Sequence, residues 1–249
     1  MHNCARTARR RAHFFDKMRP LRPRTQLTTV VASWRAATHR VACSLTPCIV
    51  TSPPDGVTAL VNPANERLQG TQFTPDECSR RLPGGPAGII YPPQVIDGLV
   101  TELGGPAMAA ALEKAGGGCA TGCAIVTLAT GELTACFTHI VHTVAPFHGD
   151  ERWRERLASA YLAAFDASCA AGLAELAVPL LGAGARGAPL AEAAAVAADV
   201  AASWRAPADA PLALLHFCVQ DEQVAQSLTE HLDRTLGRRA SASPLQRGG

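Results

Sequence analysis

The feature that most constrains the fold is a regular alternation of short apolar segments with amphipathic helical segments. The apolar segments have the length of buried strands, and the longer segments between them space their apolar residues as helices do. Predicted strands span residues 45–50, 58–62, 124–128, 139–144, 176–181 and 213–219, and predicted helices span 95–103, 106–115, 151–171, 189–204 and 221–236. Strands that alternate with helices form layered α/β domains. The sequence therefore predicts three layers, α/β/α, around a mixed but largely parallel central sheet.

The net charge of +2 conceals an uneven distribution of charge along the chain. Residues 1–43 carry nine Arg and one Lys against a single acid, Asp16, whereas residues 44–237 carry 10 basic and 20 acidic residues. An acidic body repels phosphate backbones over most of its surface, which argues against general nucleic-acid binding. No segment reaches the roughly 18 consecutive apolar residues of a membrane span, so no membrane association is expected.

These differences predict three regions: a basic leader over 1–43, one folded domain over 44–237, and a disordered tail over 238–249. The Arg-rich, acid-poor leader is typical of a transit peptide for a mitochondrion or a plastid, and we expect it to be disordered. Two alternatives remain. The leader could be a basic extension without an address, which would leave the protein in the cytoplasm, or an upstream extension of a chain that starts at Met18.

Nine cysteines and eight histidines raise the question of a metal site. No two cysteines have the Cys-x-x-Cys spacing of zinc sites. His139 and His142 lie three residues apart in one predicted strand, so their side chains point to opposite faces. We therefore predict no metal and no cofactor, and expect His142 to be a packed core histidine.

Two segments lie where parallel sheets bind their ligands, beyond the carboxyl ends of strands. One is an apolar strand that runs into Asn65, and the other is the turn Gly182-Ala-Gly-Ala-Arg-Gly187 before a helix. Small residues let backbone N–H groups approach a phosphate, and a helix N-terminus favours negative charge. Taken alone, such a turn indicates either an anion site or close packing.

The motifs together, in their order along the chain, resemble the macrodomain family, whose members bind ADP-ribose and in many cases hydrolyse its conjugates. Val61-Asn-Pro-Ala-Asn65 is similar to the family's Val-Asn-Ala-Ala-Asn, and Ile96-Asp-Gly-Leu-Val100 to its Val-Asp-Gly-Ala-Ile. His139-Ile-Val-His-Thr-Val-Ala-Pro146 resembles its Val-Ile-His-Thr-Val-Gly-Pro strand. Residues 179–189 align without gaps with its second phosphate loop. The resemblance implies a macrodomain-like fold over most of 44–237.

The resemblance also implies roles for individual residues. Asn65 corresponds to the Asn that hydrogen-bonds the distal ribose, and Asp97 to the Asp that orients or deprotonates the attacking water. Further ligand contacts are expected from Asn62, Gly98, Gly182, Ala183, Gly184, Ala185, Arg186 and Gly187. The implied function is hydrolysis of mono-ADP-ribosyl protein or of O-acetyl-ADP-ribose. The implied partners are ADP-ribose or an ADP-ribosylated protein, and the oligomeric state is not predicted.

Several positions depart from the family pattern. Thr101 stands where many members have a His. Arg186 stands where an aromatic residue is expected and could bind a phosphate or a modified carboxylate. A Pro/Gly-rich insertion over 70–93 is expected to be a long loop, with Cys78 but no His. The adenine-recognising Asp is replaced, with Cys48 nearest to its place. These departures keep three alternatives open: a non-catalytic ADP-ribose reader, an ADP-ribose 1″-phosphate phosphatase, and a divergent domain for another ligand.

Overall fold

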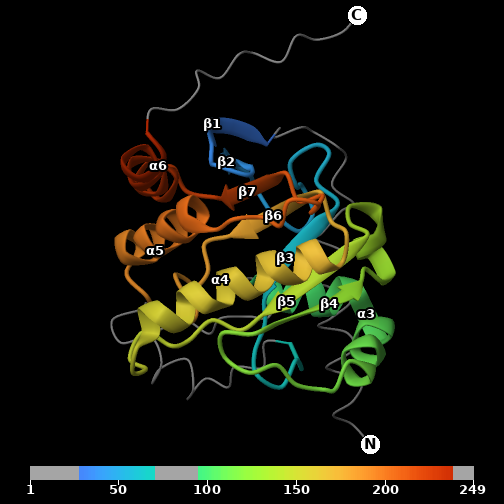
Figure 1. The fold of residues 1–249 in the computed structure, drawn as a ribbon. Coiled ribbons are helices and arrows are strands. Elements are labelled where there is room, and N and C mark those ends of the chain that lie inside the picture. Colours follow the sequence, from blue (N-terminus) through green and yellow to red (C-terminus); the bar gives the residue numbers. More distant parts are fainter. Residues whose placement is uncertain (1–27, 71–94, 238–249) are drawn as a thin grey trace, which may run out of the picture.

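The computed structural model describes residues 28–70 and 95–237, which are built around one seven-stranded sheet (Figure 1). The strands are β1 Thr29–Arg35, β2 Arg40–Leu45, β3 Ala59–Pro63, β4 Ala124–Leu128, β5 His139–Thr143, β6 Glu175–Pro179 and β7 Leu214–Val219. Their order across the sheet is β1-β2-β7-β6-β3-β5-β4. The five inner strands are parallel, and β1 and β4 run antiparallel at the two edges. The expected mixed, largely parallel sheet is confirmed.

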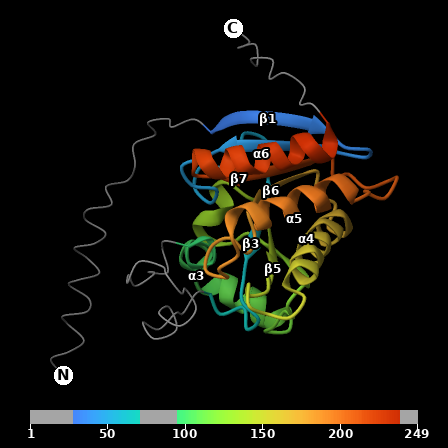
Figure 2. The ribbon, with the colours of Figure 1, turned by 90° about the vertical axis from the view of Figure 1, so that its left-hand side faces the viewer.

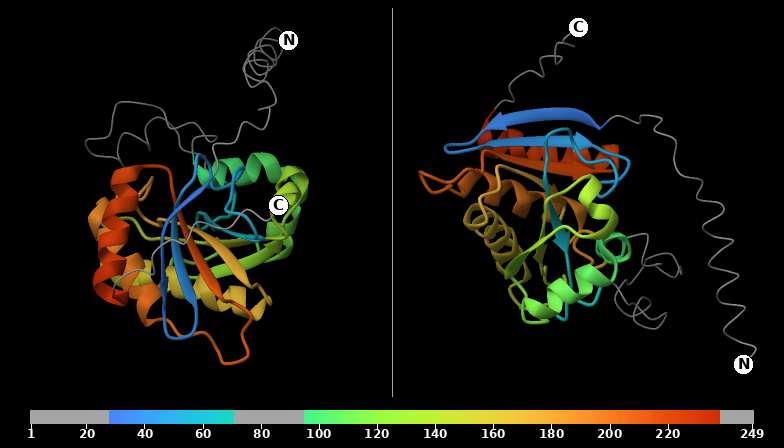
Figure 3. Two further views of the ribbon diagram at one scale, coloured as in Figure 1. Left: turned by 90° about the horizontal axis from the view of Figure 1, so that it is seen from above. Right: turned by 90° about the vertical axis from the view of Figure 1, so that its right-hand side faces the viewer.

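Helices cover both faces of this sheet. They are α3 Ile96–Lys114, α4 Trp153–Ala170, α5 Leu190–Ser203 and α6 Glu222–Leu236, with a short 3₁₀ helix, η2, at Gly131–Ala135. Figure 2 shows α3 and α4 on opposite sides of β3 and β5, and Figure 3 shows α3 and α6 on opposite sides of the sheet. The predicted α/β/α layering is therefore confirmed. None of the helices in the described ranges is long and apolar enough to cross a membrane.

Each face of the sheet buries its own apolar cluster. Tyr161 and Phe165 of α4 pack with Phe217 of β7 on one side, and Met108 of α3 packs on the other side. Strand β3 contributes to both clusters, because successive side chains of a strand point to opposite faces. This alternation determines which polar side chains of β3 lie beneath α3.

The expected domain boundary at residue 44 is wrong, and so is the expected disorder of residues 29–43. Strand β1 and most of β2 precede residue 44 and form an antiparallel pair at the edge of the sheet. Trp34 is buried against α6, where its Nε1 donates to Asp233 Oδ1 at 2.9 Å. The high Arg content concealed an alternation of buried and less buried side chains around Ala32 and Trp34. Residues 1–27, the remainder of the predicted leader, and residues 238–249, the predicted tail, lie outside the described residues.

The predicted strand over residues 45–50 is also wrong. Strand β2 ends at Leu45, and residues 49–52 form a turn. The last backbone hydrogen bond in the pairing with β7 runs from the N–H of Thr46 to the carbonyl oxygen of Val219. Pro47 has no N–H group, so the pairing cannot continue. Ile49 and Val50 lie in this turn, and their side chains are buried in the apolar cluster beneath α3. They are apolar because they belong to the core, although they do not form a strand.

The other predicted elements agree with the structure to within a few residues. The two helices expected over 95–103 and 106–115 are the two arms of α3, which is interrupted at Gly105. Gly105 has a φ of 62°, in the left-handed region that favours glycine, and Pro106 begins the second arm. The long loop expected over 70–93 lies, apart from Gly70, outside the described residues.

Candidate functional site

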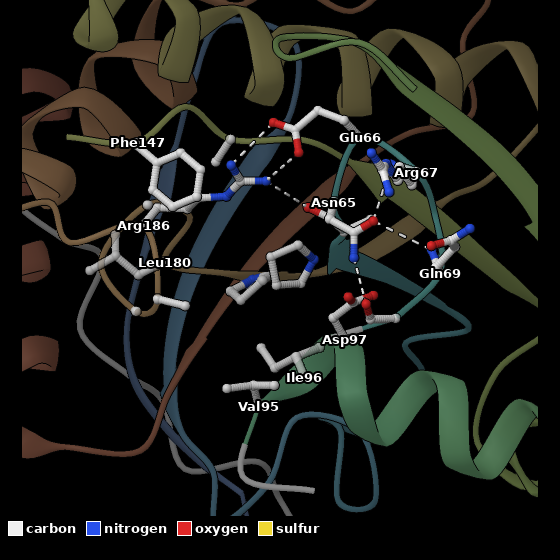
Figure 4. A pocket seen from close by; sticks show the side chains of 18 of the residues that line it. Asn65, Glu66, Arg67, Gln69, Val95, Ile96, Asp97, Phe147, Leu180 and Arg186 are labelled. Atoms are coloured by element: carbon white, nitrogen blue, oxygen red, sulfur yellow. Dashed lines mark hydrogen bonds and ion pairs between the residues drawn. The ribbon is translucent and has the colours of Figure 1, made fainter. Parts of the chain in front are cut away.

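A cleft of about 610 Å³ opens at the carboxyl ends of the inner parallel strands (Figure 4). It is lined by the segments that follow β3, β5, β6 and β7 and by the start of α3. The lining residues are Pro63, Ala64, Asn65, Glu66, Arg67, Gln69, Gly70, Val95, Ile96, Asp97, Ala145, Phe147, Pro179, Leu180, Gly182, Gly184, Ala185, Arg186 and Gln220. The topology of a parallel sheet predicts a ligand site at this edge.

Asn65 lines the cleft and braces the loop that follows β3. Its Nδ2 donates to the carbonyl oxygen of Gly70 at 2.6 Å, and its Oδ1 accepts from the backbone N–H groups of Arg67 and Gln69. An amide nitrogen carries two N–H groups, and the second finds no partner among the described residues. The loop thus fixes the orientation of Asn65 and leaves one donor for a ligand.

Asp97 lies in the first turn of α3 and is 6% exposed at the wall of the cleft. The helix N-terminus favours a negative charge at this position. Oδ1 of Asp97 accepts from Nδ2 of Asn62 at 2.9 Å, and Asn62 Nδ2 also lies 3.1 Å from Nδ1 of His142. Burial lowers the pKa of His142 to about 4, so the ring is neutral at physiological pH. On its protein side, the Asp97 carboxylate therefore accepts a hydrogen bond from an uncharged group, the Asn62 amide.

The loop between β6 and α5 forms the opposite wall. Buried Tyr161 anchors it, because its hydroxyl accepts from Leu181 N at 2.8 Å. Gly182 adopts a φ of +81°, which turns the chain toward α5. Within the described part of the chain, the backbone N–H groups of residues 183–185 donate no hydrogen bond. A short row of unpaired N–H groups ahead of a helix N-terminus can bind an anion.

Arg186 joins the two loops across the rim of the cleft (Figure 4). Its guanidinium contacts both carboxylate oxygens of Glu66, at 3.2 and 3.3 Å, and lies 4.2 Å from the centre of the Phe147 ring. A further N–H points to the carbonyl oxygen of Ala64 at 3.4 Å. Burial acts to raise the pKa of Glu66, but the hydrogen bonds and charge of Arg186 outweigh it and hold that pKa below its usual value. The cation predicted to grip phosphate is thus paired with a carboxylate.

The structure brings six of the ten predicted site residues to the cleft: Asn65, Asp97, Gly182, Gly184, Ala185 and Arg186. The other four, Asn62, Gly98, Ala183 and Gly187, do not line it. Asn62 is 1% exposed and lies behind Asp97, so its polar atoms face protein and not the cleft. Sequence reasoning missed Glu66, Phe147 and Gln220. Phe147 directly follows the motif that ends at Pro146, and this adjacency was the available signal.

Candidate metal ligands do not gather in the structure. Among residues 28–70 and 95–237, no group of three or more His, Cys, Asp or Glu side chains could hold a metal ion. His142 is buried between Asn62 and Thr127, as expected for a packed histidine. Cys78 lies outside the described residues.

The fold and the loops at its carboxyl edge define a known class of protein. The Macro domain family model matches residues 61–197, more than half of the chain, and the chain belongs to this family. A macro domain-containing protein of Caldanaerobacter subterraneus is 30% identical over 145 residues, which cover 56% of this chain and 81% of that protein.

Solved structures agree in fold. A mutant of the Oceanobacillus iheyensis macrodomain superposes with a TM-score of 0.64 at 20% identity, covering 85% of this chain and 96% of that one. A second mutant, solved with ADPR, has a TM-score of 0.63 at 21% identity and covers 83% of this chain and 100% of that one. The Trypanosoma brucei macrodomain in complex with ADP has a TM-score of 0.58 at 21% identity, covering 78% of this chain and 69% of that one.

Proposed function

We propose that the cleft binds ADP-ribose and that the chain hydrolyses ADP-ribose conjugates, with the attacking water positioned by Asp97 and Asn65. The observation that carries this proposal is that both side chains line the same cleft as the loop with unpaired N–H groups, although the three segments lie far apart in the sequence. The Oceanobacillus macrodomain solved with ADPR, a structural relative, supports ADP-ribose as the ligand.

The diphosphate of ADP-ribose would bind the loop over residues 182–187. The domain carries more acidic than basic residues, so its overall charge does not attract the ligand. The attraction is local and comes from the N–H groups of residues 183–185 and the N-terminus of α5. Binding by backbone dipoles needs no excess of basic side chains.

The chemistry needs no nucleophilic side chain. Asp97 accepts a proton from a water whose oxygen bonds to the reacting carbon of the conjugate, while the free N–H of Asn65 donates to a ribose hydroxyl. The bond between that carbon and the leaving oxygen breaks, and the proton passes from Asp97 to the leaving group. The products are ADP-ribose and a carboxylic acid, either that of the protein side chain or acetic acid according to the conjugate, and this acid releases its proton to the solvent.

The test is release of ADP-ribose from a mono-ADP-ribosylated protein by the purified full chain and by Asp97→Asn. General-base catalysis contributes about 10²–10⁴-fold, so the variant should lose at least about 100-fold in kcat while still binding free ADP-ribose. Asp209→Asn, in the exposed turn between α5 and β7, is a matched control and should retain full activity. Undiminished release by Asp97→Asn would overturn the catalytic role.

Two alternatives rest on specific positions. A non-catalytic reader is favoured by Thr101, which replaces a His and whose hydroxyl donates to the carbonyl oxygen of Asp97. A reader would bind ADP-ribose in calorimetry and release none from any conjugate. A 1″-phosphatase would release phosphate from ADP-ribose 1″-phosphate. The absence of any ADP-ribose binding would overturn all three and favour a divergent domain.

The role of Arg186 in ligand binding is separable from these outcomes. If its charge attracts the diphosphate, Arg186→Ala should weaken ADP-ribose binding more at low salt than at high salt, because salt screens charge. Glu66→Gln is the matched variant, and it should strengthen binding at low salt by freeing the cation from its partner. Equal loss of affinity at both salt concentrations for Arg186→Ala would argue against a charge role and favour a steric one.

We also propose that the leader directs the protein to a mitochondrion or plastid, now with its boundary moved to residues 1–27. This segment carries seven Arg and one Lys against the single acid Asp16, which supports a transit peptide. Residues 1–40 fused to a fluorescent protein should enter an organelle, and Arg-to-Gln replacement at positions 9–11 should reduce that import. Diffuse cytoplasmic fluorescence of the unmodified fusion would contradict the proposal.

A further inference from the structure

We propose that Asn62 and His142 are positioning residues for Asp97: a buried chain of hydrogen bonds turns the Asn62 amide so that its NH₂ group faces the carboxylate. This inference rests on the proposed hydrolytic function, because it concerns the base of that reaction. It differs from the ligand-binding role that the sequence suggested for Asn62, whose side chain does not reach the cleft.

The chain of hydrogen bonds starts at Asp97 and ends in the apolar core beneath α3. Asn62 Nδ2 lies 2.9 Å from Asp97 Oδ1 and 3.1 Å from His142 Nδ1. On the other side of the ring, His142 Nε2 lies 2.9 Å from Thr127 Oγ1, which lies 3.5 Å from Met108 Sδ. The side chains behind Asp97 are at most 8% exposed, so water does not substitute for these contacts.

The sheet itself places these residues. Asn62 on β3 is the direct register partner of His142 on β5, so their side chains point to the same face of the sheet. That face is covered by α3, whose first turn carries Asp97. Thr127 comes from β4, the strand antiparallel to β5. Four separate elements thus meet behind one carboxylate.

Only one assignment of hydrogens satisfies every contact. The Asp97 carboxylate accepts, so Asn62 Nδ2 donates one N–H to it and its second N–H to His142 Nδ1. His142 Nδ1 must then be the acceptor of the neutral ring, and Nε2 carries the hydrogen and donates to Thr127 Oγ1. The Thr127 hydroxyl in turn donates to Met108 Sδ. The orientation of the amide and the tautomer of the histidine are therefore fixed together.

The opposite orientation of the amide would disrupt the site. It would place Asn62 Oδ1 against Asp97 Oδ1, two acceptors at hydrogen-bonding distance, and would repel the charged carboxylate. In the observed orientation Asn62 Oδ1 is buried without a partner among the described residues. An unpaired buried acceptor is costly, so the contacts on the NH₂ side hold this orientation against that cost. If Asn62 served packing alone, its amide would not need to adopt this orientation.

Kinetics of the full chain test the proposal. Asn62→Leu keeps the approximate size of the side chain and removes both donors, and it should lower kcat at least 10-fold while changing KM less than about 3-fold, because Asn62 lies outside the cleft. His142→Phe should lower kcat in the same way. His142→Gln retains a donor and an acceptor and should recover most of the loss. Leu60→Val, two residues before Asn62 on the same face of β3, is the control, because it alters the packing of the core and removes no hydrogen-bond donor.

The outcomes separate this inference from the proposed function. If the wild-type chain releases no ADP-ribose, the proposed function fails, and the positioning inference fails with it. If the wild type is active but Asn62→Leu keeps its kcat within 2-fold, or loses no more than Leu60→Val, only the positioning inference is overturned.

A spectroscopic measurement on the wild-type chain covers the case in which the variants do not fold. Long-range ¹H–¹⁵N correlation spectra at pH 7 should show His142 as the neutral ring with hydrogen on Nε2. Hydrogen on Nδ1, or a protonated ring, would place a donor against the Asn62 amide and overturn the inference. This readout does not depend on any activity.

Discussion

Acid should destabilise this domain, and two of its buried histidines, His142 and His216, contribute to this loss over a pH range that their pKa values define. His216 is 5% exposed, and its Nε2 lies 2.6 Å from Ser44 Oγ. Its Nδ1 is buried and has no partner within the described residues. Burial first, and the charge of Arg40 second, lower the pKa of His216 from 6.5 to about 4. Burial alone lowers the pKa of His142 to about 4.

The sign and size of the effect follow from linkage. The unfolded chain takes up protons on these rings below about pH 6.5, whereas the folded chain does so only near pH 4. The stabilisation is therefore complete above pH 6.5 and is lost as the pH falls toward 4. At pH 5 each ring contributes a loss of about 2 kcal/mol relative to pH 7.5. Two rings remove about 4 kcal/mol, a large part of the roughly 5–15 kcal/mol that stabilises a typical domain.

Urea unfolding at pH 7.5 and at pH 5.0, followed by tryptophan fluorescence, measures this loss. In His216→Gln the difference between the two pH values should be smaller than in the wild type by about 2 kcal/mol, whatever the change in stability at pH 7.5. Ile140→Val is the control, because it removes a buried methylene near His142 and should cost about 1 kcal/mol equally at both pH values. An unchanged pH difference in His216→Gln would refute the assignment of this loss to His216.

Three further predictions concern the loops and caps. Tyr161→Phe leaves Leu181 N–H without its buried acceptor and should lower stability by about 1–3 kcal/mol and weaken ADP-ribose binding, measured by thermal unfolding and calorimetry. Gly182→Ala places a side chain at a φ of +81° and 3.3 Å from the Leu157 methyl groups. It should therefore lower the free energy of unfolding by at least about 1 kcal/mol and reduce the affinity for ADP-ribose. An unchanged affinity would show that this turn is not part of the binding site. Asp221→Ala removes the N-cap of α6 and should cost about 1 kcal/mol without altering ligand binding, and a changed affinity would contradict its purely local role.

The layered fold and the loops of the site could be predicted from the sequence because their signals are local. Helical spacing, short apolar runs and glycine turns all lie within one element or one connection. The interruption of α3 at Gly105 was predictable for the same reason, since glycine followed by proline marks a break. The resemblance to macrodomain motifs then ordered these elements and placed Asn65 and Asp97 at one edge.

The errors arose where the outcome depends on distant contacts. Trp34 is buried in a cluster that includes residues of α6, and its N–H donates to Asp233, nearly 200 residues later, so no local pattern indicates its burial. Asn62 differs from Asn65 by three positions in one motif, yet the register of β3 with β5 places its side chain beneath α3. The pairing of Arg186 with Glu66 joins two loops 120 positions apart. The expected role of Arg186 in binding an anionic ligand did not include this carboxylate, because nothing near Arg186 in the sequence indicates it.

The pairing of β1 with β2 also limits where the chain can be processed. If a leader is removed from this protein, the cut must fall upstream of Thr29, because cleavage at residue 43 would remove β1 and most of β2. Residues 214–217 of β7, which pair with the removed residues 40–43 of β2, would then form an edge with unpaired N–H and C=O groups. Such an edge readily pairs with strands of other molecules. A mature protein that starts near residue 44 should therefore aggregate, and one that starts at or before Thr28 should stay monodisperse.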